Sequence, residues 1–254
     1  MACKMLTKSV LITVVIPAYN EEKYIAKCIE SVKEAGKRIV GDVEIIVVAN
    51  RCSDKTAEIA ADSGAIVIST DDYGIAKARN AGAAAATGEI LLTFDADSIM
   101  HVDALAEVCQ RLESGKFIGG GTLSKFDRMS FGITMSALVV AKHLIPIYRK
   151  HGVMLGLMFW CYKRDFDEIG GFDESLLSLE DMDFAIRLKN HGKAQGKKYG
   201  NIKKQHATTS SRKFDEFGDW YLFKNRSLVK RIFSGKDKEA ADGFYYNIRT
   251  EEQN

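Results

Sequence analysis

The sequence has little of what marks specialised types of chain. Only two of its 254 residues are proline, and no Gly/Ser/Pro-rich linker interrupts it, so a single domain is the simplest organisation. It has five cysteines, an odd number, and none of them stands in a CxxC pair. This pattern argues against a disulfide framework or a zinc site, and it fits a reducing cytoplasm.

Long apolar runs and a large net charge are also missing. No run reaches the roughly 18 apolar residues that a membrane-spanning helix needs. The apolar run 10–16 has no small-residue cleavage site behind it, so it predicts a strand and not a signal peptide. The net charge of +2 argues against nucleic acid as a partner. Between 193 and 238, however, basic residues outnumber acidic ones, which indicates either a solvated face or a patch for diphosphate or an anionic membrane.

What is present is the composition of a globular protein, with 46% hydrophobic and 28% charged residues. Through residue 115, apolar runs alternate with segments of helical periodicity. They predict strands at 10–16, 43–48, 65–68 and 89–94, and helices at 21–35, 53–63, 75–86 and 101–112. This alternation predicts an α/β fold with a doubly wound, mostly parallel sheet of Rossmann-like type. In such sheets ligands bind beyond the carboxyl ends of the strands.

The alternation weakens in the second half. The pattern there predicts strands at 116–123 and 199–203, an apolar helical segment at 129–148, an apolar and aromatic segment at 153–162, and an amphipathic helix at 181–192. The glycines at 119–121 lack the spacing of a phosphate-binding loop.

Two acidic residues, Asp95 and Asp97, directly follow the predicted strand 89–94. Carboxylates at positions i and i+2 of extended chain point to the same side. Without a partner they would repel each other and raise each other's pKa. A hard divalent cation removes this conflict, and oxygen ligands suit magnesium or manganese. An Asp-x-Asp sequence alone is most often a surface turn, and its place after an apolar strand favours the metal site.

Several motifs together resemble glycosyltransferase family 2. They are 14–22 (VVIPAYNEE), 74–82 (GIAKARNAG), the DxD motif 95–97, 170–174 (GGFDE), the ED pair 180–181, and Arg187. Each motif is weak alone, but their order and spacing match the family over about residues 12–192. The resemblance implies a GT-A domain over 1–254, with a nucleotide-sugar-binding half at about 10–115, an acceptor-binding and catalytic half at about 116–215, and a C-terminal helical tail at 216–254.

The resemblance also implies the chemistry. It implies a divalent metal, Mn²⁺ or Mg²⁺, and inverting transfer of a sugar from a nucleoside diphosphate sugar to an acceptor hydroxyl. Inversion is a single displacement, so the hydroxyl needs one general base, and Asp181 is the candidate. By local sequence alone, Asp181 and Glu180 would be ordinary acids at a helix N-terminus. Glu180 and Trp160 are expected on the acceptor side.

Further residues are assigned to the donor by the same resemblance. Asp97 is expected to bind the metal and the diphosphate, with Asp95 near the ribose. Arg79 is expected to reach the diphosphate or the nucleobase, although an arginine in an alanine-rich helix is otherwise an ordinary surface residue. The remaining expected donor contacts are Pro17, Ala18, Tyr19, Glu21, Asn50, Asp54, Lys77 and Ala96.

One departure from the family pattern concerns the nucleotide. The family often has two acids after the second strand, where this chain has Ala49 and Asn50. An amide both donates and accepts hydrogen bonds, whereas a carboxylate only accepts them. The donor can therefore be a UDP- or a GDP-sugar, with uridine as the default. Cys52 follows, and because no histidine lies near it in sequence we interpret it as a packing or turn residue.

His206 is a candidate second metal ligand. It lies about 25 residues after Asp181 among polar residues, and the predicted strand 199–203 leads into it. Neutral imidazole binds manganese well, and Thr208, Ser210, Ser211 and Arg212 could then face the diphosphate. The alternative is an ordinary loop histidine.

Two other functions and the surroundings of the enzyme stay open at this stage. A sugar-1-phosphate nucleotidyltransferase would carry a Gly-rich, basic N-terminal loop in place of residues 17–20, and a non-catalytic nucleotide-sugar-binding module would not need the intact acid set. Segment 129–160 is either core or a surface for a hydrophobic or lipid-linked acceptor. We expect a cytoplasmic enzyme able to lie at the inner face of a membrane, and a homodimer is compatible with the sequence.

Overall fold

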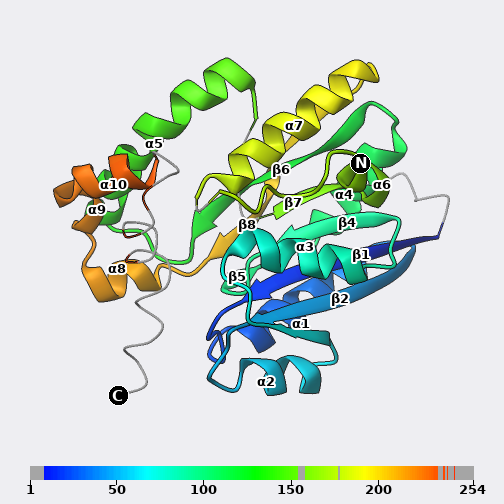
Figure 1. Cartoon of the computed structure of the whole chain (residues 1–254), viewed down its shortest axis with the longest axis horizontal. Helices are drawn as coiled ribbons and strands as arrows, with labels where there is room; N and C mark the ends of the chain where they lie inside the picture. The colour runs from blue at the N-terminus through cyan, green and yellow to red at the C-terminus, as the bar shows by residue number, and fades with distance from the viewer. Residues whose placement is uncertain are drawn as a thin grey trace.

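The fold is described from a computed structural model, which covers residues 9–153, 158–176, 178–233, 237, 239 and 243. Its centre is an eight-stranded sheet in the order β3-β2-β1-β4-β7-β6-β8-β5 (Figure 1). The strands are β1 Val10–Ala18, β2 Gly41–Asn50, β3 Ile66–Thr70, β4 Ile90–Phe94, β5 Ser98–Ile99, β6 Phe117–Phe126, β7 Met158–Tyr162 and β8 Lys198–Thr209.

The sheet is mostly parallel, as the alternating pattern predicts. β1 pairs in parallel with β2 and β4, β2 with β3, and β6 with β8. β7 is inserted antiparallel between β4 and β6, and β5 is antiparallel to β8. The carboxyl ends of β1, β2, β4, β6 and β8 consequently meet at one edge of the sheet, where a ligand is expected.

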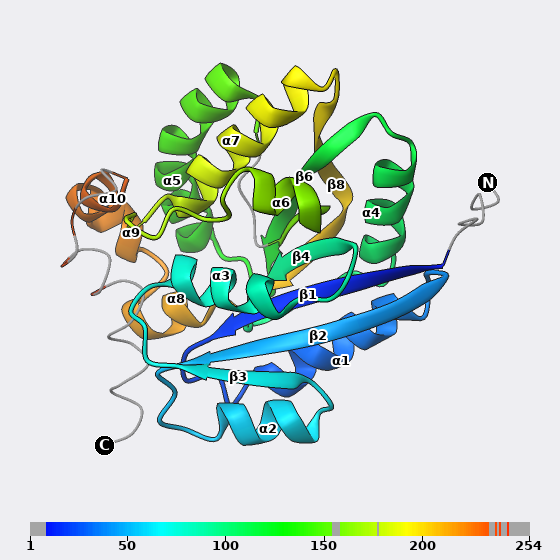
Figure 2. The same ribbon diagram turned by 45° about the vertical axis from the view of Figure 1, so that its right-hand side comes forward.

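Helices cover both faces of the sheet. α1 Ile25–Gly36, α2 Thr56–Asp62 and α4 Ala104–Glu113 pack on one face, and α3 Ile75–Ala85, α6 Lys163–Glu168 and α7 Glu180–Ala194 pack on the other. Figure 2 shows α1 under β2 and α2 under β3, with α3 on the opposite face, above β1. The split follows from the strands, whose successive residues point to opposite faces. Val14 packs with α1, for example, and Val15 packs with α3.

A third group of helices lies beside the sheet. It contains α5 Phe131–His151, α8 Arg212–Phe217, α9 Tyr221–Lys224 and α10 Arg226–Ile232, and Figure 1 shows α5, α9 and α10 gathered together. Ile133, Phe214, Leu222 and Val229 form its own small core. Among these helices, α5 confirms the apolar helix predicted at 129–148.

No uninterrupted apolar run reaches about 18 residues, but α5 as a whole is long and apolar enough to cross a membrane by length and composition. It has 21 residues, and only 17% of its most apolar stretch is buried. Lys142 and His143 interrupt the apolar sequence, but the turns on either side of them are almost wholly apolar. An apolar helix that is largely exposed needs an explanation, since most such helices are core helices.

Close packing of α3 on the sheet depends on a glycine. A Cβ atom added to Gly82 would lie 2.3 Å from Val15 Cγ1 and 3.0 Å from Val48 Cγ2. These two valines belong to β1 and β2, so a larger residue would push α3 away from both strands. Arg79 and Asn80 lie three and two residues earlier on the same helix, so the position of Gly82 also sets theirs.

Gly82→Ala is therefore expected to destabilise the protein by about 1–3 kcal/mol, the usual effect of overpacking a core. Urea unfolding followed by circular dichroism measures it. Ala84→Ser on the exposed side of α3 is the matched control and should change the free energy of unfolding by less than about 0.5 kcal/mol. Equal stability of the two variants would contradict the close approach.

Candidate active site

A cavity of about 460 Å³ opens at the carboxyl edge of the parallel strands. It takes residues from the ends of β1, β2, β4, β6 and β8, from α3, and from the start of α7. The expected site residues that line it are Pro17, Ala18, Tyr19, Glu21, Asn50, Arg79, Asp95, Ala96, Asp97, Glu180 and Asp181. Segments more than 160 residues apart in the chain, such as those of Pro17 and Asp181, therefore meet in one place, as the topology requires.

Arg79 is the buried cation at the centre of this site. Its Nη1 donates to Glu180 Oε1 at 2.7 Å, and its Nη2 donates to Asp95 Oδ1 at 3.3 Å. The guanidinium also lies 5.1 Å from the ring centroid of Phe172. With only 5% of its surface exposed, Arg79 is not the surface residue that its alanine-rich helix would suggest. It holds the acid after β4 and the acid that begins α7 in fixed positions.

Arg212 makes the corresponding link on the other side. Its guanidinium donates two bonds of 2.6 Å to the buried carboxylate of Glu21 and one of 3.1 Å to Asp97 Oδ2. The backbone brings the partners together, because Thr209 pairs with Ser98 and the N–H of Ser210 donates to the carbonyl of Asp97. The chain after β8 is thereby fastened to the DxD motif.

Acidic groups outnumber basic ones around the cavity. Burial raises the pKa of Asp95 to about 6, with Asp97 adding to the rise and Arg79 opposing it. Burial, together with the negative charge of Glu180, raises the pKa of Asp181 to about 7, against the effect of Arg79. A carboxyl with a pKa near neutrality can take up and release a proton at physiological pH.

Asn80 joins α3 to the GGFDE turn. Its Nδ2 donates to the carbonyl of Phe172 and to Glu174 Oε1, both at 2.9 Å, and its Oδ1 accepts from the N–H of Phe172. Gly171 has φ of +64°, and a Cβ there would lie 2.7 Å from Asn80 Oδ1. The glycine is thus required both by its backbone conformation and by the close approach of the amide. Two motifs 90 residues apart form one structural unit.

The far end of the cavity, at β1 and β2, is built from amide and aromatic groups. The Nδ2 of Asn50 donates to the carbonyl of Asp72 at 2.6 Å. Arg51 has φ of +53°. Its guanidinium carbon lies 5.1 Å from the ring centroid of Tyr19 and 4.7 Å from the ring centroid of Tyr73. Arg51 does not line the cavity itself but contacts Tyr19, which does. It was not among the residues predicted from the sequence, where the departure from the usual acids after the second strand indicated only Asn50.

Three expected site residues lie elsewhere. Trp160 is fully buried in β7 between β4 and β6 and does not line the cavity, so its placement on the acceptor side is wrong. Asp54 accepts from the N–H groups of Thr56 and Glu22 and so organises the start of α2. Lys77 forms an ion pair of 3.7 Å with Asp72 outside the cavity lining.

His206 lies in β8 by its backbone, while its side chain is outside the described residues. Thr209, which pairs with Ser98 next to the DxD motif, is three residues further on, or about 10 Å along an extended strand. The predicted role of His206 as a metal ligand stays a prediction. Arg212 is the side chain after β8 that contacts Asp97.

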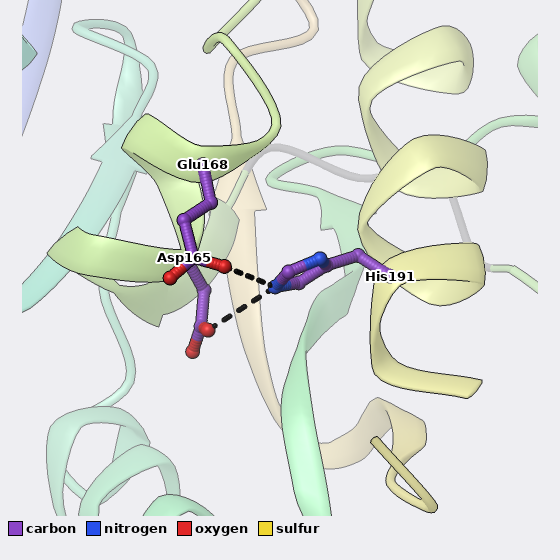
Figure 3. Close-up of side chains that lie close together, drawn as sticks. All are labelled: Asp165, Glu168 and His191. Atoms are coloured by element: carbon purple, nitrogen blue, oxygen red, sulfur yellow. Dashed lines mark hydrogen bonds and ion pairs between the residues drawn. The ribbon is translucent and has the colours of Figure 1, made fainter. Parts of the chain in front are cut away.

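A separate cluster lies at the other end of α7. His191 Nε2 is 3.3 Å from both Asp165 Oδ1 and Glu168 Oε2 (Figure 3). The three ligand atoms lie within 4.8 Å of one another, as in a cation site. His191 is, however, eleven residues along α7 from Glu180, about 16 Å along the helix axis. The cluster joins α6 to α7 and is not part of the cavity that contains Asp97.

Comparisons with known proteins agree with this arrangement. The family model described as Glycosyl transferase family 2 matches residues 13–167. The chain is 39% identical over 106 residues to the low-salt glycan biosynthesis hexosyltransferase Agl6 of Haloferax volcanii, covering 41% of this chain and 25% of that protein. It is 27% identical over 164 residues to the undecaprenyl-phosphate 4-deoxy-4-formamido-L-arabinose transferase of Photorhabdus laumondii. This match covers 62% of this chain and 50% of that protein. The chain thus spans a quarter to a half of these relatives.

Solved structures share the fold. The mannosyltransferase PcManGT of Pyrobaculum calidifontis, in complex with GDP-Man and Mn²⁺, matches with a TM-score of 0.62 at 18% identity, over 92% of this chain and 66% of that one. Glucosyl-3-phosphoglycerate synthase of Mycobacterium tuberculosis, with Mn²⁺, UDP and phosphoglyceric acid, matches with a TM-score of 0.59 at 19% identity, over 87% and 77%. These similarities show that the sheet and its helices form a GT-A fold.

The Arg79 ion pairs lead to a stability prediction. Arg79→Met should destabilise the protein by about 3–5 kcal/mol, because Glu180 and Asp95 lose their buried partner. Arg38→Met removes an exposed ion pair with Asp103 and should cost about 1 kcal/mol or less. Urea unfolding of both variants tests the difference. A loss as small for Arg79→Met as for Arg38→Met would show that Arg79 does not hold the site together.

Proposed function

Because the chain belongs to glycosyltransferase family 2, we propose that it transfers a sugar from a nucleoside diphosphate sugar to an acceptor hydroxyl with inversion at the anomeric carbon. The observation that carries this proposal is the convergence of Asp97 and Asp181 on one cavity at the carboxyl edge of a GT-A sheet. One acid follows β4 and the other begins α7, so each can serve a different end of a bound donor.

The donor nucleotide fits the end of the cavity formed by β1 and β2. Tyr19, stacked on Arg51, and Asn50, tied to the loop after β3, offer a flat aromatic edge and an amide. Solved relatives bind UDP or GDP-mannose, and both nucleotides stay open for this chain. Lys77 and Asp54 can act only indirectly, by shaping the loops around this end.

A divalent metal fits the acidic end. Five carboxylates there, those of Glu21, Asp95, Asp97, Glu180 and Asp181, face three cationic side chains, Arg79, Lys213 and Arg212. A diphosphate adds more negative charge, and oxygen donors suit Mg²⁺ or Mn²⁺. Asp97 would hold the ion, with Asp95 beside it. When bound, the metal would neutralise the charge that develops on the leaving diphosphate.

Asp181 is the proposed general base. It accepts the proton of the acceptor hydroxyl as the hydroxyl oxygen bonds to the anomeric carbon and the bond from that carbon to the diphosphate oxygen breaks. Its raised pKa keeps the carboxylate basic enough for this step near neutral pH. Arg79 is proposed as a positioning residue, which sets the start of α7 through Glu180 and the DxD motif through Asp95.

The relatives do not identify the acceptor of this chain, because the compounds that their names mention, undecaprenyl phosphate and phosphoglyceric acid, differ in chemical class. A cytoplasmic location is consistent with the free thiols of the four cysteines in the described chain, Cys28, Cys52, Cys109 and Cys161. A homodimer remains a prediction.

Metal dependence is tested at Asp97. Asp97→Asn should lower turnover by at least about 100-fold, because it removes the charge that holds the cation, while the melting temperature changes little. Donor hydrolysis with Mn²⁺, measured over a panel of UDP- and GDP-sugars, gives the rates. Asp62→Asn, an exposed acid at the end of α2, is the control. Full activity in excess chelator would contradict the proposed dependence on a divalent metal.

The base is tested by Asp181→Asn, which should lower turnover by about 10²–10⁴-fold and leave the donor affinity measured by calorimetry nearly unchanged. Asp183→Asn on the same helix is the matched control. A base must be deprotonated to act, so kcat/KM of the wild-type protein should rise as the pH increases through about 7 and then level off. A collapse of donor affinity in Asp181→Asn would instead assign Asp181 to the donor site.

A further inference from the structure

The cavity has a second half that the donor does not explain. Besides the carboxylates, its walls contain aliphatic and aromatic side chains, contributed by Val140 and Leu144 of α5, Leu222 of α9, and Val229, Ile232 and Phe233 at α10. His143 stacks on Phe233 with ring centroids 5.0 Å apart. A nucleotide, a sugar and a diphosphate are all polar, so none of them matches this surface.

The opposite face of the helix that lines this half carries exposed apolar residues as well, with the exposed Thr134 and Lys142 among them. Phe131, Leu138 and Ile145 follow one another at intervals of seven residues and are 73%, 57% and 46% exposed. At 100° per residue they form one stripe, about 160° around the helix from Val140 and about 120° from Leu144. The exposed Tyr148, Arg149 and Lys150 follow at the end of α5.

This outer stripe has the character of an interfacial helix. Helices that lie in the surface of a bilayer bury an apolar face and place aromatic and basic residues at the level of the head groups. Among the aromatic rings of the described residues, Phe131 packs only against Trp220, in a T-shaped arrangement with ring centroids 5.7 Å apart. One helix therefore presents an apolar surface to the outside and an apolar wall to the cavity.

We propose that the acceptor is a membrane lipid with a hydroxyl-bearing head: the head lies beside Asp181, the apolar chain lies between α5, α9 and α10, and the outer stripe of α5 rests on the bilayer. The inference rests on the proposed function and adds the class of its acceptor. It follows from one cavity that is lined both by Asp97 and Asp181 and by the apolar side chains of α5, α9 and α10. A small polar acceptor would leave the apolar half exposed to water at a cost in free energy.

The apolar half is tested with a series of n-alkyl β-D-glucosides from butyl to octyl, below their micelle concentrations, by calorimetry on the full chain. The affinity should rise by about two- to fourfold per methylene group, as expected for burial of the chain. Leu144→Asn should weaken binding of the octyl compound by about tenfold, and Leu138→Asn on the outer stripe should leave it within about twofold. Val140→Thr, which keeps the volume, serves if Leu144→Asn does not fold.

The outer stripe is tested with vesicles of phosphatidylcholine and phosphatidylglycerol in a sedimentation assay. Here the same two variants should exchange roles, with Leu138→Asn losing binding several-fold and Leu144→Asn retaining it. An affinity that does not depend on chain length, or the same loss in both variants, would overturn the proposal. UDP and GDP binding with Mn²⁺ is measured on the same preparations. Failure of nucleotide binding with intact chain-length dependence would contradict the proposed reaction and leave the lipid site standing.

Discussion

The buried guanidinium of Arg79 is the interaction on which the site depends. It bonds to Glu180 at the start of α7 and to Asp95 after β4, two segments that no strand pairing connects directly. A buried charge without partners is costly, so the three groups are stable only together. Asn80, the next residue of α3, ties the GGFDE turn to the same helix. The distance between the donor acids and the proposed base is thus set by one turn of α3.

The position of that turn depends in turn on packing. Gly82 allows α3 to lie directly on Val15 and Val48, and the aromatic rings of Phe159, Phe166, Phe172 and Phe184 fill the space between β7, α6 and α7. Polar contacts and close packing therefore determine different features of the site. The glycine and the rings fix where the helices lie, and the arginines fix where the acids point.

The concentration of acids has a cost for the folded state. The pKa of Asp181 is about 7 in the fold and near 3.8 in an unfolded chain. The folded state therefore holds this proton more tightly, and the stability that Asp181 contributes falls as the pH rises through the range between these two values. A site of this kind is stabilised by added positive charge, which fits the proposed binding of a cation together with the donor.

The sequence by itself determined the α/β class, most of the strands and helices, and the residues at the carboxyl ends of β1, β2 and β4. Periodicity and residue type suffice for these features because they reflect local rules of burial and alternation. The pairing of Arg79 with Glu180 and of Arg212 with Glu21, the burial of Trp160, and the exposure of α5 were decided only by the tertiary structure. Each depends on which distant segments become neighbours: Trp160 is buried because β7 is inserted between β4 and β6, and α5 stays exposed because it packs on α9 and α10 rather than on the sheet.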